Sequence, residues 1–203
     1  ALVLTSDTPY QEMASRLALA WSVSEHLFSC GPDEIESLLA ELELPGKSFR
    51  VRACRLDEKH TPEEGVALAR HVGGLLSPKY RVDLKNPDVE LRILMASKFH
   101  VGILAGEIDR PSIEARKPEN RPFNHPISLH PKLARTLVNL TRVRKGETLL
   151  DPFCGTGGIL LEAGLVECLP IGGDIDPRMV DGTLKNLKHF GIDKTDIRKM
   201  DIS

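Results

Sequence analysis

The chain has 203 residues, of which 41% are hydrophobic and 28% are charged, and its formal net charge at pH 7 is −2. This composition excludes a membrane-spanning protein, because no apolar run approaches the roughly 20 residues that a bilayer span needs and no cleavable signal opens the sequence. We therefore expect a cytoplasmic protein whose contacts with nucleic acid depend on local basic patches. The cysteines form no Cys-x-x-Cys pair and the histidines no His-x-x-x-His pair, which predicts reduced thiols and no metal site.

The first half of the chain alternates expected strands and helices. Trp21–Phe28 is typical of a strand, and a helix is expected to begin near Pro32. In Phe49–Cys54 apolar residues alternate with arginines, which is the period of a half-buried strand. Three further stretches are expected strands: Tyr80–Leu84, Val89–Ala96 and Phe99–Ala105. Together with the helix described next, they predict an α+β module.

A helix N-terminus is expected at Thr61. Pro62 suits the first helical position, and Glu64 can complete a capping box with Thr61. Prolines and charges are then dense from 111 to 130, which predicts a linker. After it, Pro131 is expected to begin another helix.

From Thr148 the pattern becomes strand, glycine loop, helix, strand, helix, strand, which predicts a parallel α/β sheet. The first strand ends on Asp151 and leads into a glycine loop before a helix at Ile159–Glu167. Such a turn lets a ligand approach the backbone closely. The second strand ends at Asp174, at the spacing where a carboxylate meets ribose hydroxyls.

Asp151 decides between two classes of ligand for this loop. A carboxylate at the tip of the first strand repels the pyrophosphate of a dinucleotide. It attracts the ammonium and sulfonium groups of S-adenosylmethionine, which carries no phosphate. Asp176 precedes Pro177 and is interpreted as a helix N-cap. Cys154, within the loop, is interpreted as a small packing residue rather than a nucleophile, because no base lies beside it in the sequence.

The following stretches carry a family resemblance: Asp151–Ala163 followed by Gly173–Pro177, Arg121–Pro126 with Leu129 and Pro131–Arg135, and residues 46–110, which include Val82–Glu90. They resemble the THUMP-containing nucleic-acid methyltransferases. Within these, the chain is most similar to the archaeal and eukaryotic tRNA guanine-N2 methyltransferases that act on guanosine ten.

The resemblance implies a domain order. It places part of an N-terminal ferredoxin-like domain at 1–45, a THUMP domain at 46–110, a linker at 111–130 and the N-terminal part of a methyltransferase domain at 131–203. The implied fold is the first three parallel strands of a Rossmann-like class I methyltransferase core, preceded by an α+β THUMP/ferredoxin-like RNA-binding region. The implied activity is methyl transfer from S-adenosyl-L-methionine to the exocyclic N2 amine of guanosine in tRNA, at position ten.

By the same resemblance, Asp151 and Gly155–Gly157 hold the methionine end of the donor, Asp174 the ribose and Asp201 the adenine. The candidate cofactor-binding residues are Asp151, Phe153, Gly155, Thr156, Gly157, Asp174, Ile175 and Asp201. The family's catalytic loop, of the Asp-Pro-Pro-Tyr type, does not occur in the sequence. No catalytic residue is therefore assigned, and we expect the chain to be a fragment.

Two alternatives remain open from the sequence. One is another THUMP methyltransferase that acts on ribosomal RNA or on a different tRNA guanosine. The other is a non-catalytic subunit that binds RNA or the methyl donor. Six basic residues are either a phosphate-binding face or an ordinary solvated face: Arg50, Arg52, Arg55, Lys79, Arg81 and Lys85.

Overall fold

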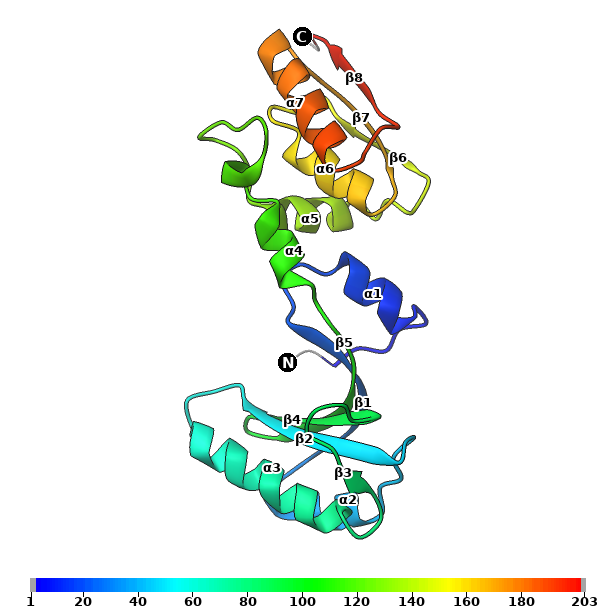
Figure 1. Cartoon of the computed structure of the whole chain (residues 1–203), viewed down its shortest axis with the longest axis vertical. Coiled ribbons are helices and arrows are strands. Elements are labelled where there is room, and N and C mark those ends of the chain that lie inside the picture. Colours follow the sequence, from blue (N-terminus) through cyan, green and yellow to red (C-terminus); the bar gives the residue numbers. More distant parts are fainter. Residues whose placement is uncertain (1–2, 202–203) are drawn as a thin grey trace. The chain divides into compact units, whose positions relative to one another are not determined.

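The computed structural model describes residues 3–201 and divides into two units (Figure 1). Unit 1 consists of the segment up to Gln11 and Ser22–Glu107, and unit 2 consists of Glu12–Trp21 and the segment from Ile108 onward. The first crossing of the chain between them falls within α1 (Tyr10–Arg16). No helix within residues 3–201 is both long enough and apolar enough to cross a membrane.

Unit 1 is a five-stranded mixed sheet with helices on one face. Its elements are β1 (Ser22–Cys30), the 3-10 turn η1 (Pro32–Glu34), α2 (Ile35–Ala40), β2 (Ser48–Arg55), α3 (Pro62–Leu76), β3 (Arg81–Val82), β4 (Val89–Met95) and β5 (Phe99–Glu107). The strand order is β1-β5-β4-β2-β3. β2 is parallel to β3 and β4, whereas β5 is antiparallel to β4 and β1. The range 1–45 thus contributes β1 to the sheet that β2, β4 and β5 share.

The core of unit 1 lies between the sheet and the helices α2 and α3 (Figure 1). Alternate residues of β4, such as Leu91 and Ile93, are fully buried there. The capping box expected at Thr61 is confirmed, because its side chain accepts from the Glu64 N–H while the Glu64 carboxylate accepts from the Thr61 N–H. This box fixes where α3 begins.

A buried carboxylate organises the opposite face of the unit 1 sheet. Glu90 accepts hydrogen bonds from Arg50 Nε at 2.5 Å and from Arg92 Nε at 2.7 Å. Burial raises the pKa of Glu90, but the hydrogen bonds from Arg92 and Arg50 outweigh burial and hold this pKa below its ordinary value. Arg92 also bonds Glu107 of β5 at 2.5 Å. The charges of these arginines are therefore largely balanced within the sheet.

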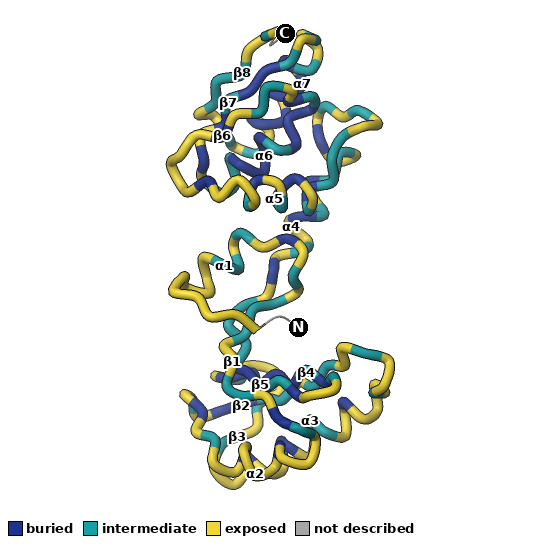
Figure 2. Tube along the Cα trace, turned by 180° about the vertical axis from the view of Figure 1, so that it is seen from behind, coloured by how far each residue is buried: buried dark blue, intermediate teal, exposed yellow. Residues whose placement is uncertain are grey.

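Unit 2 carries a parallel sheet. Its elements after α1 are α4 (Arg110–Ala115), the 3-10 turn η2 (Pro118–Asn120), α5 (Pro131–Leu140), β6 (Thr148–Asp151), α6 (Gly158–Leu165), β7 (Leu169–Asp174), α7 (Pro177–His189) and β8 (Asp196–Lys199). The strand order β6-β7-β8 with parallel pairing confirms the expected α/β pattern. Buried residues gather along α6 and the neighbouring strands (Figure 2).

The structure differs in detail from two local expectations. The proline-rich linker contains the helix α4, because Asp109 caps its N-terminus by accepting from the Ser112 N–H and because Pro111 fits a first turn. The strand expected at Tyr80–Leu84 is reduced to the two residues of β3. There Asp83 accepts from the backbone N–H groups of Lys85 and Asn86, which turns the chain out of the sheet.

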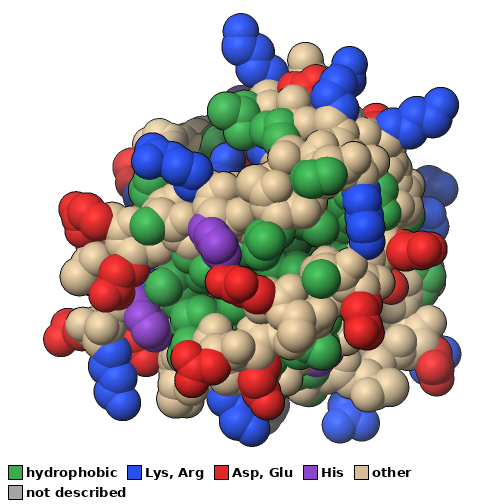
Figure 3. Space-filling view, turned by 90° about the horizontal axis from the view of Figure 1, so that it is seen from below, with side chains coloured by type: hydrophobic (Ala, Val, Ile, Leu, Met, Phe, Trp, Pro, Cys, Tyr) green, Lys and Arg blue, Asp and Glu red, His purple; other side chains and the backbone are tan. Residues whose placement is uncertain are grey.

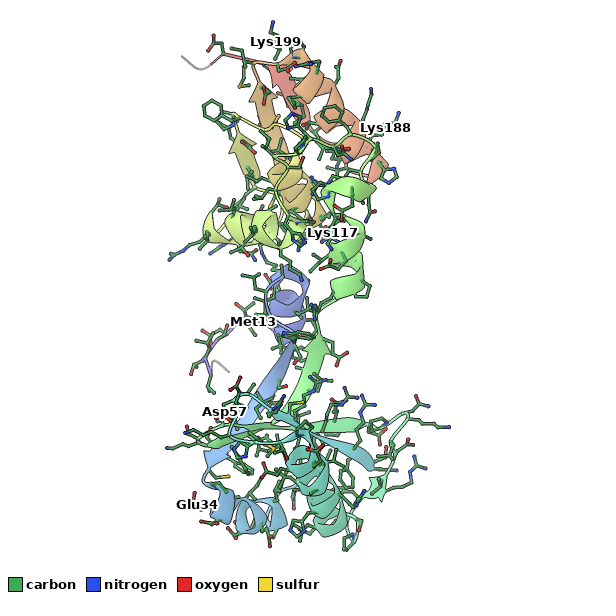
Figure 4. The ribbon with its side chains drawn as sticks, turned by 90° about the vertical axis from the view of Figure 1, so that its left-hand side faces the viewer. Met13, Glu34, Asp57, Lys117, Lys188 and Lys199 are labelled. Carbon is green, nitrogen blue, oxygen red and sulfur yellow. The ribbon has the colours of Figure 1, made fainter. Side chains whose placement is uncertain are left out.

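A buried ion cluster ties α4, α5 and α6 together. Glu162 of α6 is fully buried and accepts from Arg116 at 2.8 and 3.2 Å and from Arg135 Nε at 2.9 Å. Lys117, labelled in Figure 4, lies beside this cluster in sequence and pairs with Glu114 at 2.6 Å. A third buried arginine, Arg121, has a lowered pKa because of its burial. Unit 2 thus holds three buried guanidinium groups near one buried carboxylate.

Candidate functional site

The candidate site lies at the carboxyl ends of the three parallel strands. Asp151 is the last residue of β6 and pairs with Gly172 of β7, whereas Asp174 is the last residue of β7 and pairs with Lys199 of β8. Lys199 is labelled in Figure 4. Because the strands are parallel, these ends share one edge of the sheet, where α/β proteins bind their ligands.

The glycine loop connects β6 to α6 at this edge. A backbone hydrogen bond from Cys154 N to Gly173 O, at 2.8 Å, holds it to β7. Gly155 and Gly157 have φ angles of +53° and +75°, in the left-handed region that favours glycine. These two residues let the chain turn sharply from the strand into the helix, so that backbone rather than side chains borders the acidic strand ends.

Asp174 holds the loop against the strand. Its Oδ2 atom accepts from the Gly155 N–H at 3.0 Å, and its Oδ1 atom accepts from the Asp176 N–H at 3.0 Å. Each carboxylate oxygen has two lone pairs, so each keeps one acceptor site for a ligand hydroxyl. The geometry is therefore compatible with the ribose role expected for Asp174.

Asp151, at the end of β6, has a pKa above the ordinary value of a carboxyl group. Burial raises its pKa above the ordinary carboxyl value, and the charge of Asp174 raises this pKa further, whereas the hydrogen bond from the Phe153 N–H lowers it. Within residues 3–201, neither Asp151 nor Asp174 forms an ion pair. Two neighbouring carboxylates without a cationic partner favour a positively charged ligand.

The remaining candidate residues divide into exposed and buried groups. Phe153 and Ile175, which follow just after the two strand ends, are 74% and 64% exposed. Asp201 is exposed and follows β8. Thr156 is buried, and its Oγ1 lies 3.0 Å from Ser128 Oγ. Phe153 and Ile175 can thus contact a ligand directly, whereas the Thr156 side chain faces the segment before α5.

Asp176 and Cys154 have structural contacts. Asp176 Oδ1 accepts from the Arg178 N–H at 2.9 Å, which confirms the expected N-cap of α7. Cys154 is buried, its Sγ lies 3.7 Å from Thr183 Oγ1, and burial raises its pKa. A thiol with a raised pKa is a poor nucleophile, which favours the packing interpretation. Within residues 3–201, no three His, Cys, Asp or Glu side chains gather to hold a metal ion.

Sequence reasoning missed two polar residues of α7 that contact the loop. Thr183 Oγ1 donates to Gly155 O at 2.9 Å, and Asn186 Nδ2 donates to Thr156 O at 2.9 Å. Both side chains are fully buried. Their signal in the sequence is weak: they are polar residues on the same helix face as the buried apolar residues Val180 and Leu187.

The parallel sheet, the glycine loop and the acidic strand ends define unit 2 as a Rossmann-like class I methyltransferase core. Residues 118–203 match the family described as UPF0020: RMKL-like, methyltransferase domain. TrmN from Thermus thermophilus is a solved structure with this fold: the TM-score is 0.51 and the identity 24%, over 99% of this chain and 61% of that chain.

Named relatives extend the similarity beyond unit 2. The chain is similar to tRNA (guanine(10)-N2)-dimethyltransferase of Methanothermobacter thermautotrophicus, with 35% identity over 192 residues that cover 93% of this chain and 57% of the relative. It is also similar to tRNA (guanine(6)-N(2))-methyltransferase THUMP3 of Mus musculus, with 31% identity over 183 residues that cover 88% of this chain and 35% of the relative. The chain thus spans little more than half the length of the archaeal relative and about a third of the mouse one.

Proposed function

We propose that this chain is part of an S-adenosyl-L-methionine-dependent tRNA methyltransferase. The observation that carries the proposal is the pair of carboxylates, Asp151 and Asp174, at the edge of a class I core beside a glycine loop. The donor set fits the methyl donor, whose ammonium and sulfonium groups are cationic, and it disfavours a phosphate-bearing dinucleotide. When bound, this cofactor supplies an electrophilic methyl group on sulfur.

The proposed roles follow the geometry of the edge. Asp151 and the loop Gly155–Gly157 hold the amino-acid end of the donor, and Asp174 accepts from the ribose hydroxyls. Asp201, beyond β8, accepts from the adenine amine. Phe153 and Ile175 are exposed beside the carboxylates and supply apolar contact to the donor.

The proposed acceptor is the exocyclic N2 amine of a guanosine in tRNA, at position ten. The name of the archaeal relative supports this choice, and the mouse relative supports guanosine six as the second candidate. The amine is a poor nucleophile, because its lone pair is conjugated into the ring. Transfer requires acceptors that orient the amine and take up charge, and we assign no residue of 3–201 to that task.

For unit 1 we propose a THUMP-type RNA-binding role in a cytoplasmic enzyme. Charge alone does not identify the RNA-contacting face: Arg50 is paired with Glu90, and Arg81 lies 3.5 Å from Asp83. On the face seen in Figure 3, basic and acidic side chains are interspersed. This pattern favours recognition of a folded RNA by shape and backbone rather than by one basic stripe.

The test is methyl transfer by the gene product that carries this sequence. We would incubate it with methyl-labelled S-adenosylmethionine and an unmodified tRNA transcript, digest the RNA and identify the labelled nucleoside. Labelled N2-methylguanosine or N2,N2-dimethylguanosine is expected, and replacement of guanosine ten should abolish it. Label on another base, or none with a folded protein that binds the donor, would contradict the proposed reaction.

A further inference from the structure

The inward face of α7 contacts both the glycine loop and the segment around Phe123. Gly182, Thr183 and Asn186 lie on this face, and all three are buried. The Phe123 ring lies against Gly182 so closely that a Cβ added there would be 2.0 Å from Phe123 Cδ1. A helix that follows the second strand therefore contacts two segments of unit 2 that are separate in sequence.

Asn186 uses its whole amide in these contacts. Its Oδ1 accepts from the Phe123 N–H at 2.9 Å, and its Nδ2 donates to Phe123 O at 2.8 Å and to Thr156 O at 2.9 Å. One side chain thus joins the segment before α5 to the glycine loop. An amide is suited to this position because it offers one acceptor and two donors without charge.

These bonds fix the orientation of the loop peptides. Thr183 holds the Gly155 carbonyl towards α7 and Asn186 holds the Thr156 carbonyl there. In a trans peptide the N–H points opposite to the carbonyl, so the Thr156 N–H is directed away from α7. Gly155 and Gly157 flank these peptides and tolerate several backbone conformations. The Thr156–Gly157 peptide is held at both of its polar groups, because Asn186 bonds its carbonyl while its N–H donates to Cys154 O at 2.7 Å.

We propose that Asn186 is a positioning residue for the amino-acid end of the methyl donor: it sets the loop peptides and holds Phe123 beside them. This inference rests on the proposed function. It goes further because it assigns donor affinity to a residue of α7 that is buried behind the loop. It also predicts a larger effect at the amino-acid end of the donor, since Asn186 bonds the Thr156 carbonyl whereas Asp174 bonds the Gly155 N–H.

The test compares two probes on the chain and its variants by calorimetric titration. S-adenosylhomocysteine has the amino-acid end, and 5′-methylthioadenosine lacks it. Asn186→Asp keeps the shape but turns an oxygen towards the carbonyls of Phe123 and Thr156. The control is Asn139→Asp in α5, which loses a comparable amide bond to Arg16 O at 2.9 Å and keeps the acceptor for Arg16 Nε at 3.3 Å.

We expect Asn186→Asp to weaken S-adenosylhomocysteine binding at least tenfold, with less than a twofold change for 5′-methylthioadenosine and with no effect of Asn139→Asp. Gly182→Ala keeps every hydrogen-bonding group but displaces Phe123, and it should show the same selective loss if Asn186→Asp does not fold. Equal weakening of the binding of both probes, or no change in either, would contradict the positioning role of Asn186 but not the proposed function. Binding of neither probe by the parent chain would overturn the proposed function as well.

Discussion

Replacement of Glu162 by glutamine tests the ion cluster that ties α4, α5 and α6 together. Glu162 is the buried carboxylate that accepts from Arg116 and Arg135, and its charge also offsets the buried Arg121. Glutamine keeps the size but removes the charge, so three buried guanidinium groups lose their shared anion. Breaking a buried ion pair from one side costs about 3–5 kcal/mol.

The expected shift is large against the stability of a domain of this size. Domains are stable by about 5–15 kcal/mol, and urea slopes are about 1–3 kcal/mol per molar. The urea midpoint of unit 2 should therefore fall by about 1–5 M in Glu162→Gln. Circular dichroism would follow the unfolding, together with the fluorescence of Trp21, which is the one tryptophan of the sequence and lies in unit 2.

Two controls separate the buried cluster from surface charge. Lys145 and Glu167 form an exposed pair at 2.6 Å, so Lys145→Gln should leave the urea midpoint nearly unchanged. Joint replacement of Glu162, Arg116 and Arg135 by apolar residues should recover part of the loss, because it removes two of the three buried charges that Glu162→Gln leaves without their anion. A midpoint of Glu162→Gln equal to that of the parent chain would refute the reasoning.

The other predictions concern the two carboxylates and a helix cap. Asp174→Ala should weaken S-adenosylmethionine binding by about 1–3 kcal/mol in a calorimetric titration. Asp174→Asn should have an intermediate affinity, because it keeps one acceptor oxygen. Unchanged affinity in Asp174→Ala would remove Asp174 from the site. Burial raises the pKa of Asp151, so ionising this carboxyl costs more free energy in the folded chain than in the unfolded chain. At pH values above this pKa, the ionised carboxylate therefore lowers the free energy of unfolding. Asp151→Asn should therefore raise the urea midpoint at neutral pH, and this gain should fade as the pH falls through the pKa of Asp151. The same variant should bind the donor more weakly. A stability gain that persists in acid would contradict this origin. Thr61→Ala removes the cap of α3 and should lower the stability of unit 1 by about 0.5–2 kcal/mol in urea unfolding, whereas Thr61→Ser should be close to neutral.

Local signals made much of unit 2 predictable. The turn from β6 into α6 was expected from Asp151 and the glycines, and the cap of α7 from Asp176 and Pro177. These features depend on residues adjacent in sequence. The helix α4 is not evident from the sequence, because the dense prolines of 111–130 are typical of a linker, although Pro111 occupies a first helical turn where proline is favourable.

Contacts between distant residues were not predictable. The pairing of β1 with β5 joins Ser22 to Glu107, and local patterns carry no information about which strands pair. The contacts of Asn186 with Phe123 and Thr156 likewise depend on three segments that come together only in the fold. The roles of the candidate residues towards the donor stay predictions, because they concern a ligand and not the chain itself.

The most direct test of the central claim is an equilibrium titration of the chain with S-adenosylmethionine in the presence and absence of NAD⁺. The acidic edge formed by Asp151 and Asp174 predicts one bound S-adenosylmethionine per chain, displaced by S-adenosylhomocysteine, unaffected by NAD⁺ and strongly weakened in Asp151→Asn. Displacement by NAD⁺, or donor affinity unchanged in a folded Asp151→Asn, would contradict the assignment of this edge to a cationic methyl donor.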